Sequence, residues 1–383
     1  MACDGANARC MTVAHLNLAL QKLIVVKVGS SLLVEPDGLV RHRWMETLVA
    51  DISERHKAGQ RVIIVSSGAI ALGARRLGFE QGGRASLADA QAAASVGQIL
   101  LSGMWADLLA AQGLTAAQML VTLDDLEDRR RYLNITATLD RLLGAGAVPV
   151  INENDSVATE EIRFGDNDRL AARVAQAAGA GAVLLLSDVD GLYDRDPRDA
   201  GAQHIPQVAK IDGRTRLMVS GASSSGMGSG GMASKLDAAD IATRAGIGLA
   251  IASGLVDHPL AALGEGAKAT WFAPREGASA RKIWIGGRLS VKGRILIDAG
   301  AHTALRGGAS LLPAGARGVS GSFKRGDVVE IVAPNGETLA RGLSEYDAAD
   351  AALICGKKTA ELEGILGSVP RQVLVHRDQM VLL

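Results

Sequence analysis

The chain has 383 residues, of which 48% are hydrophobic, enough to bury a substantial core in two or three domains. Lys and Arg number 41, as do Asp and Glu, so the formal net charge is zero and no global field draws the whole protein to nucleic acid or an anionic membrane. With 46 Gly and only 3% aromatic residues, the composition favours an α/β protein with tight turns and close helix packing.

The cysteines and the apolar runs bear on localisation. Cys3, Cys10 and Cys355 form no metal-like pair, which indicates free thiols in a reducing, cytoplasmic compartment. No apolar run approaches the roughly 18–20 residues of a membrane span, so we expect no membrane partner. Polar side chains interrupt residues 1–20, which we expect to form a partly disordered N-terminal extension with Met11 as an alternative start.

Strands and helices are predicted to alternate over residues 21–275. This alternation indicates a mainly parallel sheet with helices on both faces, and ligands of such sheets bind at the carboxyl ends of the strands. The predicted strands are 22–29, 61–65, 113–120, 147–154, 181–186 and 248–252, and the predicted helices are 42–59, 68–78, 85–112, 124–143, 169–178 and 233–245.

The pattern changes after residue 275. Residues 276–291 resemble a linker in composition, and residues 292–383 contain short alternating segments separated by Gly turns. This pattern predicts a small β-barrel-like second domain.

Residues 151–168, INENDSVATEEIRFGDND, crowd carboxylates and amides at the end of a predicted strand. Such groups repel one another unless a cation or an ammonium-bearing ligand neutralises them. A solvated acidic loop is the alternative for this segment taken alone.

Two Gly-containing segments supply the opposite charge. Lys27 lies in an apolar strand just before Gly29, where an ammonium group is costly unless it meets an anion; a lysine at the sheet edge is the alternative. In residues 226–235, GMGSGGMASK, glycines precede a helix that opens near Lys235, a combination that suits a phosphate group. A Gly/Ser linker is the alternative for that segment.

Taken together, these segments predict phosphoryl transfer. The lysines and the glycine loop would hold nucleotide phosphates, and the acidic cluster would order the lysines and Mg²⁺ and receive the acceptor. No general base is evident, which suits an acceptor that is already an anion at neutral pH, such as a carboxylate.

The motifs KVGSS, VSSGAI, INENDSV, FGDND, SDVDGLYDRDP and GSGGMASK, in this order, resemble the glutamate 5-kinases of the amino-acid kinase family. The tail, around KGRILIDAGA and GASLLPAGARGVSGSFKRGDVVEI, resembles the PUA domain that many bacterial members carry. The resemblance covers residues 21–275 and 292–383, and therefore nearly the whole chain.

The resemblance implies ATP-dependent phosphorylation of the glutamate side-chain carboxylate, the first step of proline biosynthesis, with Mg²⁺ as cofactor. It implies that Lys27, Lys235 and Asp168 are catalytic, with Asp168 holding the two lysines in register. Glutamate would be bound by Ser67, Asp155 and Asn167. ATP would be bound by Lys27, Ser187, Asp188, Ser229, Gly230, Gly231, Met232, Ala233, Ser234 and Lys235. No protein side chain is predicted to ligate the metal directly.

The resemblance also implies inhibition by proline, a dimer or tetramer of the chain, and glutamate-5-semialdehyde dehydrogenase as a candidate partner. One alternative is another amino-acid kinase, which acts on acetylglutamate, aspartate or a nucleotide phosphate. The other is an RNA-binding protein that works through the PUA-like tail, although that tail shows only dispersed basic residues such as Lys324, Arg325, Lys357 and Lys358.

Overall fold

The computed structural model describes residues 17–35, 39–157, 167–220, 231–275, 291–367 and 371–383. The chain divides into two compact units, Met1–Asp128 with Asn134–Glu276, and Arg129–Leu133 with Gly277–Leu383. Each unit is described by itself.

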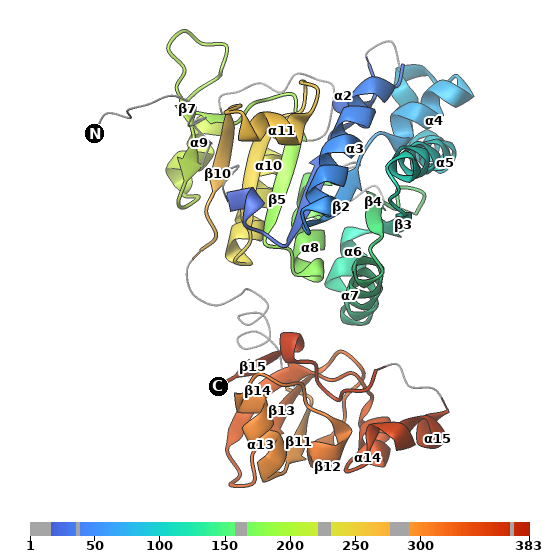
Figure 1. Cartoon of the computed structure of the whole chain (residues 1–383), viewed down its shortest axis with the longest axis vertical. Coiled ribbons are helices and arrows are strands. Elements are labelled where there is room, and N and C mark those ends of the chain that lie inside the picture. Colours follow the sequence, from blue (N-terminus) through green and yellow to red (C-terminus); the bar gives the residue numbers. More distant parts are fainter. Residues whose placement is uncertain (1–16, 36–38, 158–166, 221–230, 276–290, 368–370) are drawn as a thin grey trace. The chain divides into compact units, whose positions relative to one another are not determined.

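The first unit is built on an eight-stranded sheet with the strand order β3-β4-β2-β1-β5-β9-β10-β8 (Figure 1). The six strands from β3 to β9 are parallel, and β10 runs antiparallel to β9. The mainly parallel sheet is therefore confirmed. The bounds are β1 Leu23–Val28, β2 Arg61–Ser66, β3 Ala116–Val121, β4 Val148–Glu153, β5 Ala182–Ser187, β8 Gln207–Val208, β9 Gly248–Ser253 and β10 Ala269–Phe272.

Strand β1 lies at the point where the strand order reverses. On one side of β1 the sheet continues through β2 to β4 and β3. On the other side it continues through β5 to β9. In parallel sheets the connections diverge at such a point and leave a crevice beyond the carboxyl ends of the strands. The ends of β1, β2 and β5 therefore mark the place where a ligand would bind.

Helices cover both faces of this sheet. Ile24 and Val26 of β1 share a buried core with residues of α3, α5 and α11. Lys27 points to the opposite face, because neighbouring side chains of a strand alternate, and α8 and α10 contact the sheet there. The helices are α2 Ser30–Leu33, α3 His42–Lys57, α4 Ala69–Leu77, α5 Leu87–Ala111, α6 Leu123–Glu127, α7 Arg129–Gly144, α8 Asn167–Ala178, α9 Gly213–Ser220, α10 Met232–Arg244 and α11 Pro259–Gly264.

The helix predicted over residues 124–143 is wrong as one element, since the structure has two helices there. Thr122 and Asp125 form a reciprocal capping box that starts α6, and Asp128 is extended, which ends it before α7. The short helices α9 and α11 were not predicted, nor was the hairpin of β6 (Leu192–Tyr193) and β7 (His204–Ile205). Elements of this length bury too few residues to leave a periodic pattern in the sequence.

Part of the predicted N-terminal extension belongs to the first unit. The side chain of Leu18 is fully buried in the main core. The Gln60 side-chain amide donates hydrogen bonds to the carbonyl oxygens of Leu18 and Gln21, at 2.8 and 2.7 Å. The packed structure therefore begins before residue 21, while residues 1–16 lie outside the described part.

Helix α5 has the length and composition of a membrane span, although the sequence analysis expected no such stretch. It packs into the first unit along one face, and its other face, which carries Ile99 and Leu100, is exposed. Leu101, Trp105 and Leu109 lie in the main core, and the helix contacts α3, α4 and β3. A Cβ atom on Gly97 would lie 1.7 Å from the carbonyl oxygen of Ala69, so α4 and α5 touch backbone to backbone.

The second unit contains a five-stranded mixed sheet with the order β12-β11-β13-β14-β15. Ile295 of β11, Val329 and Ile331 of β13 and Leu362 of α15 are fully buried and share one core. The small β-rich second domain is therefore confirmed. Its elements are β11 Gly293–Ile297, α13 Ala299–Arg306, β12 Ala316–Gly321, β13 Val328–Val332, β14 Thr338–Leu343, α14 Ala348–Ile354, α15 Leu362–Leu366 and β15 Met380–Leu382.

The contact between α4 and α5 yields a stability prediction. Gly97→Ala should lower the free energy of unfolding by about 1–3 kcal/mol, because the added methyl group overlaps the Ala69 carbonyl and forces the helices apart. Gly103→Ala, in the same helix, is the control: no atom lies within 4 Å of the added Cβ. It should raise stability by ~0.5–1 kcal/mol, since Ala favours helix more than Gly. Thermal unfolding followed by circular dichroism measures both variants, and equal midpoints would contradict this account of the contact.

Candidate active site

A cavity of about 580 Å³ opens at the carboxyl ends of β1, β2, β4 and β5. Residues from all four strand ends and from the start of α10 line it. Most of the predicted site residues are among them: Lys27, Ser67, Asp155, Asn167, Ser187, Asp188, Gly231, Met232, Ala233 and Lys235.

Asp168 lies between the two predicted lysines. Its carboxylate oxygens are 2.6 Å from the Lys27 Nζ and 3.2 Å from the Lys235 Nζ, and all three side chains are at least nine-tenths buried. Burial alone would raise the pKa of Asp168, but the charges and hydrogen bonds of the two lysines hold it below its usual value. The three groups together carry a net charge of +1 at the edge of the cavity, which favours an anionic ligand.

The start of α10 adds hydrogen-bond donors to this positive charge. Gly231 precedes the first helical residue in an extended conformation and caps the helix with no side chain. The first backbone N–H groups of a helix have no partner within it, and with the helix dipole they favour anions. Lys235 lies in this first turn, so donors and ammonium act on the same end of the cavity.

A second group of polar side chains lies on the β2–β4 side. The Asn167 Nδ2 donates to the Ser67 Oγ at 2.7 Å and to the Asn152 Oδ1 at 3.4 Å. Asn152 in turn donates to the Gln98 Oε1 at 2.7 Å, which fixes its orientation. These bonds connect the ends of β2 and β4 to the first residue of α8.

Two buried acceptor atoms in this group have no hydrogen-bond donor among the described residues, the Oδ1 atoms of Asp155 and Asn167. Burial raises the pKa of Asp155 to about 6, and the nearby positive charge of Arg84 opposes the rise. Since buried polar atoms are normally hydrogen-bonded, this group is suited to a ligand that brings positively charged donors, such as an ammonium.

The wall beyond β5 combines hydroxyl, aromatic and apolar side chains. The Ser187 Oγ donates to the Asp188 Oδ1 at 2.9 Å. Tyr193 lines the cavity and packs edge-on against His204, with the ring centroids 5.4 Å apart. Met218 and Val219 of α9 add apolar surface. Such a mixed wall suits the flat heterocycle and sugar of a nucleotide.

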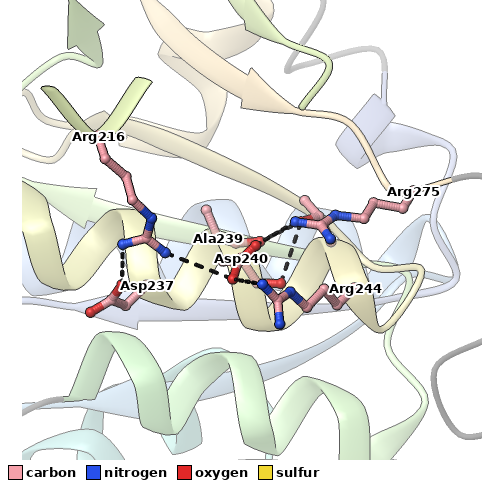
Figure 2. A network of polar contacts seen from close by, with 7 residues as sticks. Arg216, Asp237, Ala239, Asp240, Arg244 and Arg275 are labelled. Atoms are coloured by element: carbon pink, nitrogen blue, oxygen red, sulfur yellow. Dashed lines mark hydrogen bonds and ion pairs between the residues drawn. The ribbon is translucent and has the colours of Figure 1, made fainter. Parts of the chain in front are cut away.

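A network of charged side chains fixes α9 against α10 (Figure 2). Arg216 of α9 lies 2.8 Å from Asp237 and 3.7 Å from Asp240, both on α10. Arg244, at 2.8 Å, and Arg275 also pair with Asp240. Through Arg216, the network therefore links α9, which carries Met218 and Val219, to the helix that carries Lys235.

The remaining predictions have mixed outcomes. Asp168 does not line the cavity but contacts two residues that do, and Ser234 of α10 does not line it. Ser229 and Gly230 lie outside the described residues. Asn152 and Tyr193 also line the cavity and stand inside the INENDSV and SDVDGLYDRDP motifs, but they were not predicted as site residues. Arg84 and Met218 were not predicted either, because only the folded chain brings them to the cavity.

Family models and named relatives match most of the chain. The model of the "Amino acid kinase family" matches residues 22–253, and that of the "PUA domain" matches residues 293–366. A "Glutamate 5-kinase" of Sphingopyxis alaskensis is 63% identical over 94% of this chain and 97% of its own length. Proteins of the same name from Novosphingobium aromaticivorans and Zymomonas mobilis are 62% and 57% identical, each over 94% of this chain and over 96% and 91% of their own lengths. The chain thus belongs to the amino acid kinase family and carries a PUA domain.

Proposed function

We propose that this chain phosphorylates the side-chain carboxylate of L-glutamate with ATP to give L-glutamyl 5-phosphate, the first step of proline biosynthesis. The observation that carries the proposal is that one cavity combines two groups of side chains, the Lys27–Asp168–Lys235 cluster and the group of Ser67, Asp155 and Asn167. A phosphate donor fits the positive cluster, and an acceptor with an ammonium group fits the other group. The names of the relatives support the same substrate.

In this mechanism Lys27 contacts the ATP phosphates and Lys235 neutralises charge on the phosphoryl group in transit. Asp168 keeps the two ammonium groups in place. An oxygen of the glutamate side-chain carboxylate attacks the γ-phosphorus, the bond from that phosphorus to the β–γ bridging oxygen breaks, and ADP leaves. The acceptor is already an anion at neutral pH, so no residue has to remove a proton, and catalysis depends on positioning and charge neutralisation.

Glutamate binding is assigned to the second of these groups. The Asp155 carboxylate would meet the substrate ammonium, and the Oδ1 of Asn167 would accept a further hydrogen bond. Both are buried acceptors without a donor among the described residues. Ser67 holds the Asn167 amide through a 2.7 Å hydrogen bond and so fixes the direction of that acceptor. Ser187, Asp188 and residues 229–235 are assigned to ATP.

Mg²⁺ is the proposed cofactor, bound with the nucleotide. Within the described parts of the chain, no three His, Cys, Asp or Glu side chains cluster as metal ligands. We therefore propose that the Mg²⁺ ion is held mainly by phosphate oxygens and water, the usual arrangement for nucleotide-bound magnesium. The ion would supply charge neutralisation on the phosphates, while Asp168 remains engaged with the two lysines.

The wider assignments follow from the same function. We propose a kinase domain at residues 21–275, a linker and a PUA domain at residues 292–383, in a cytoplasmic homo-oligomer that proline inhibits. A hydroxylamine trapping assay tests the function directly, because glutamyl 5-phosphate gives a hydroxamate that forms a coloured complex with ferric iron. We expect a product that requires both ATP and glutamate and that decreases when proline is added. Turnover of aspartate or UMP with glutamate inert would refute the proposal.

Replacement of Lys235 tests the charge at the transferring phosphoryl group. Lys235→Ala should lower kcat by about 100–1000-fold and change the KM for ATP by less than about threefold, because its charge matters most in the transition state. Lys210, an exposed lysine that does not line the cavity, is the matched control, and Lys210→Ala should leave both constants unchanged. A normal kcat in the Lys235 variant would rule out this role.

The raised pKa of Asp155 predicts a pH dependence of glutamate binding. Its carboxylate must be ionised to attract the ammonium, so kcat/KM for glutamate should fall as the pH decreases through about 6. Asp155→Asn should raise the KM for glutamate by about 10–100-fold and remove this inflection. The KM for ATP should stay within about threefold of wild type. A KM effect confined to ATP would move Asp155 to the nucleotide side.

The same shift predicts that Asp155 costs stability at neutral pH. Its pKa rises from 3.8 to about 6 on folding, so ionisation favours the unfolded chain, and the cost develops as the pH rises from about 4 to 6. Asp155→Asn should therefore stabilise the protein by on the order of 2 kcal/mol above pH 6, and the gain should shrink toward pH 4. Unfolding midpoints from pH 4 to 8 measure it, and a pH-independent difference would contradict the assignment.

A further inference from the structure

Arg84 lies in the connection between α4 and α5, at the end of the short 3-10 helix Glu80–Gly83. Neighbouring residues fix this connection. Gly83 has a φ of +74°, and a Cβ on it would lie 2.8 Å from the Ala74 Cβ, so the backbone is pressed against α4. At the other end, the Ser86 Oγ caps α5 by accepting a hydrogen bond from the Asp89 N–H at 3.0 Å. The backbone of Arg84 is therefore held in place while its side chain remains exposed.

The Arg84 side chain lines the same cavity as Asp155, Ser67 and Asn167. The other lysines and arginines that line this cavity are all paired with carboxylates. Lys27 and Lys235 share Asp168, and Arg195 and Arg198 pair with Asp194 and Asp196 at 3.0 and 2.6 Å. For Arg84, the structure records no ion pair with a described carboxylate. Its guanidinium acts on Asp155 only through the longer-range attraction between their charges.

An α-amino-acid substrate carries two opposite charges that Asp155 and Arg84 would complement. A free α-amino acid carries its ammonium and its α-carboxylate on the same carbon atom. An ammonium that binds Asp155 therefore brings a carboxylate into the immediate neighbourhood of Asp155, where it needs a cation. A planar guanidinium is well suited to a carboxylate, because its N–H groups can donate two parallel hydrogen bonds.

We propose that Arg84 determines specificity by binding the α-carboxylate of the amino-acid substrate. This inference rests on the proposed function. Asp155 and Arg84 then form a pair that recognises the zwitterionic end of a free amino acid, and the side-chain carboxylate extends toward Lys27 and Lys235. Peptide-bound glutamate and simple dicarboxylic acids lack one or both of these charges and would be excluded.

The test compares L-glutamate with its α-amide, L-isoglutamine, which keeps the side-chain carboxylate but has a neutral carboxamide in place of the α-carboxylate. Both are measured in the full-length protein as substrates in the hydroxamate assay, and the α-amide also as an inhibitor competitive with glutamate. Wild type should prefer glutamate by about 10–100-fold in kcat/KM, the usual effect of a hydrogen-bonded charge. In Arg84→Ala, kcat/KM for glutamate should fall by a similar factor through KM, with little change for the α-amide.

Two further variants separate recognition from general damage. Arg84→Lys keeps the charge without the planar fork and should recover part of the preference for glutamate. Arg76→Ala removes an exposed arginine on α4 that does not line the cavity, and it should behave as wild type with both substrates.

The possible outcomes are distinct. Wild type that is active on glutamate, together with an Arg84→Ala variant that still discriminates against the α-amide, would overturn the role of Arg84 alone. A rise confined to the KM for ATP would move Arg84 to the nucleotide and overturn it as well. A wild-type protein inactive on glutamate would refute the proposed function, and this inference with it.

Discussion

The buried ion cluster of Lys27, Asp168 and Lys235 is the constraint on which the arrangement of the cavity depends. A carboxylate that is 1% exposed is stable as an anion only if nearby cations replace its lost hydration. Here the two cations come from β1 and α10, and the carboxylate comes from α8. Loss of Asp168 would leave two buried ammonium groups without a counter-charge, and loss of either lysine would leave Asp168 with a single cation. The cluster therefore holds three elements that are distant in sequence in one arrangement.

The cluster also explains why the positive end of the cavity is organised before a ligand binds. Free lysine side chains are flexible, and ordering them during binding would cost conformational entropy. Asp168 has already ordered both, and the N-terminus of α10 presents its backbone donors beside them. The charged network around Asp240 then holds α9, and with it the apolar wall, against the same helix (Figure 2). A preorganised site of this kind is what phosphoryl transfer requires.

Much of this arrangement could be predicted from the sequence, and the reasons are local. Lys27 lies in an apolar strand, and Lys235 follows a glycine segment at the start of a helix. Each lysine is therefore unusual for the few residues around it in the sequence. Arg84 carried no such signal, because a single arginine in a polar connection looks like any solvated residue. Its place at the cavity depends on the backbone contact between α4 and α5 at Gly97, which no local pattern predicts. Asn152 was visible in its motif, but its selection needed the pairing of β4 beside β2.

The start of α8 connects the two groups of side chains at the cavity. Asn167 and Asp168 are its first two residues and neighbours in the chain, yet Asn167 bonds to Ser67 on the proposed acceptor side and Asp168 to the lysines on the phosphate side. A rotation or shift of α8 would therefore move Asn167 relative to Ser67 and Asp168 relative to the two lysines at the same time. In-line transfer depends on the distance between the acceptor and the transferring phosphate, and misplacement by about 1 Å can cost ~100-fold in rate. The start of α8 thus couples the alignment of both groups, because contacts to β1, to the end of β2 and to α10 fix its position together.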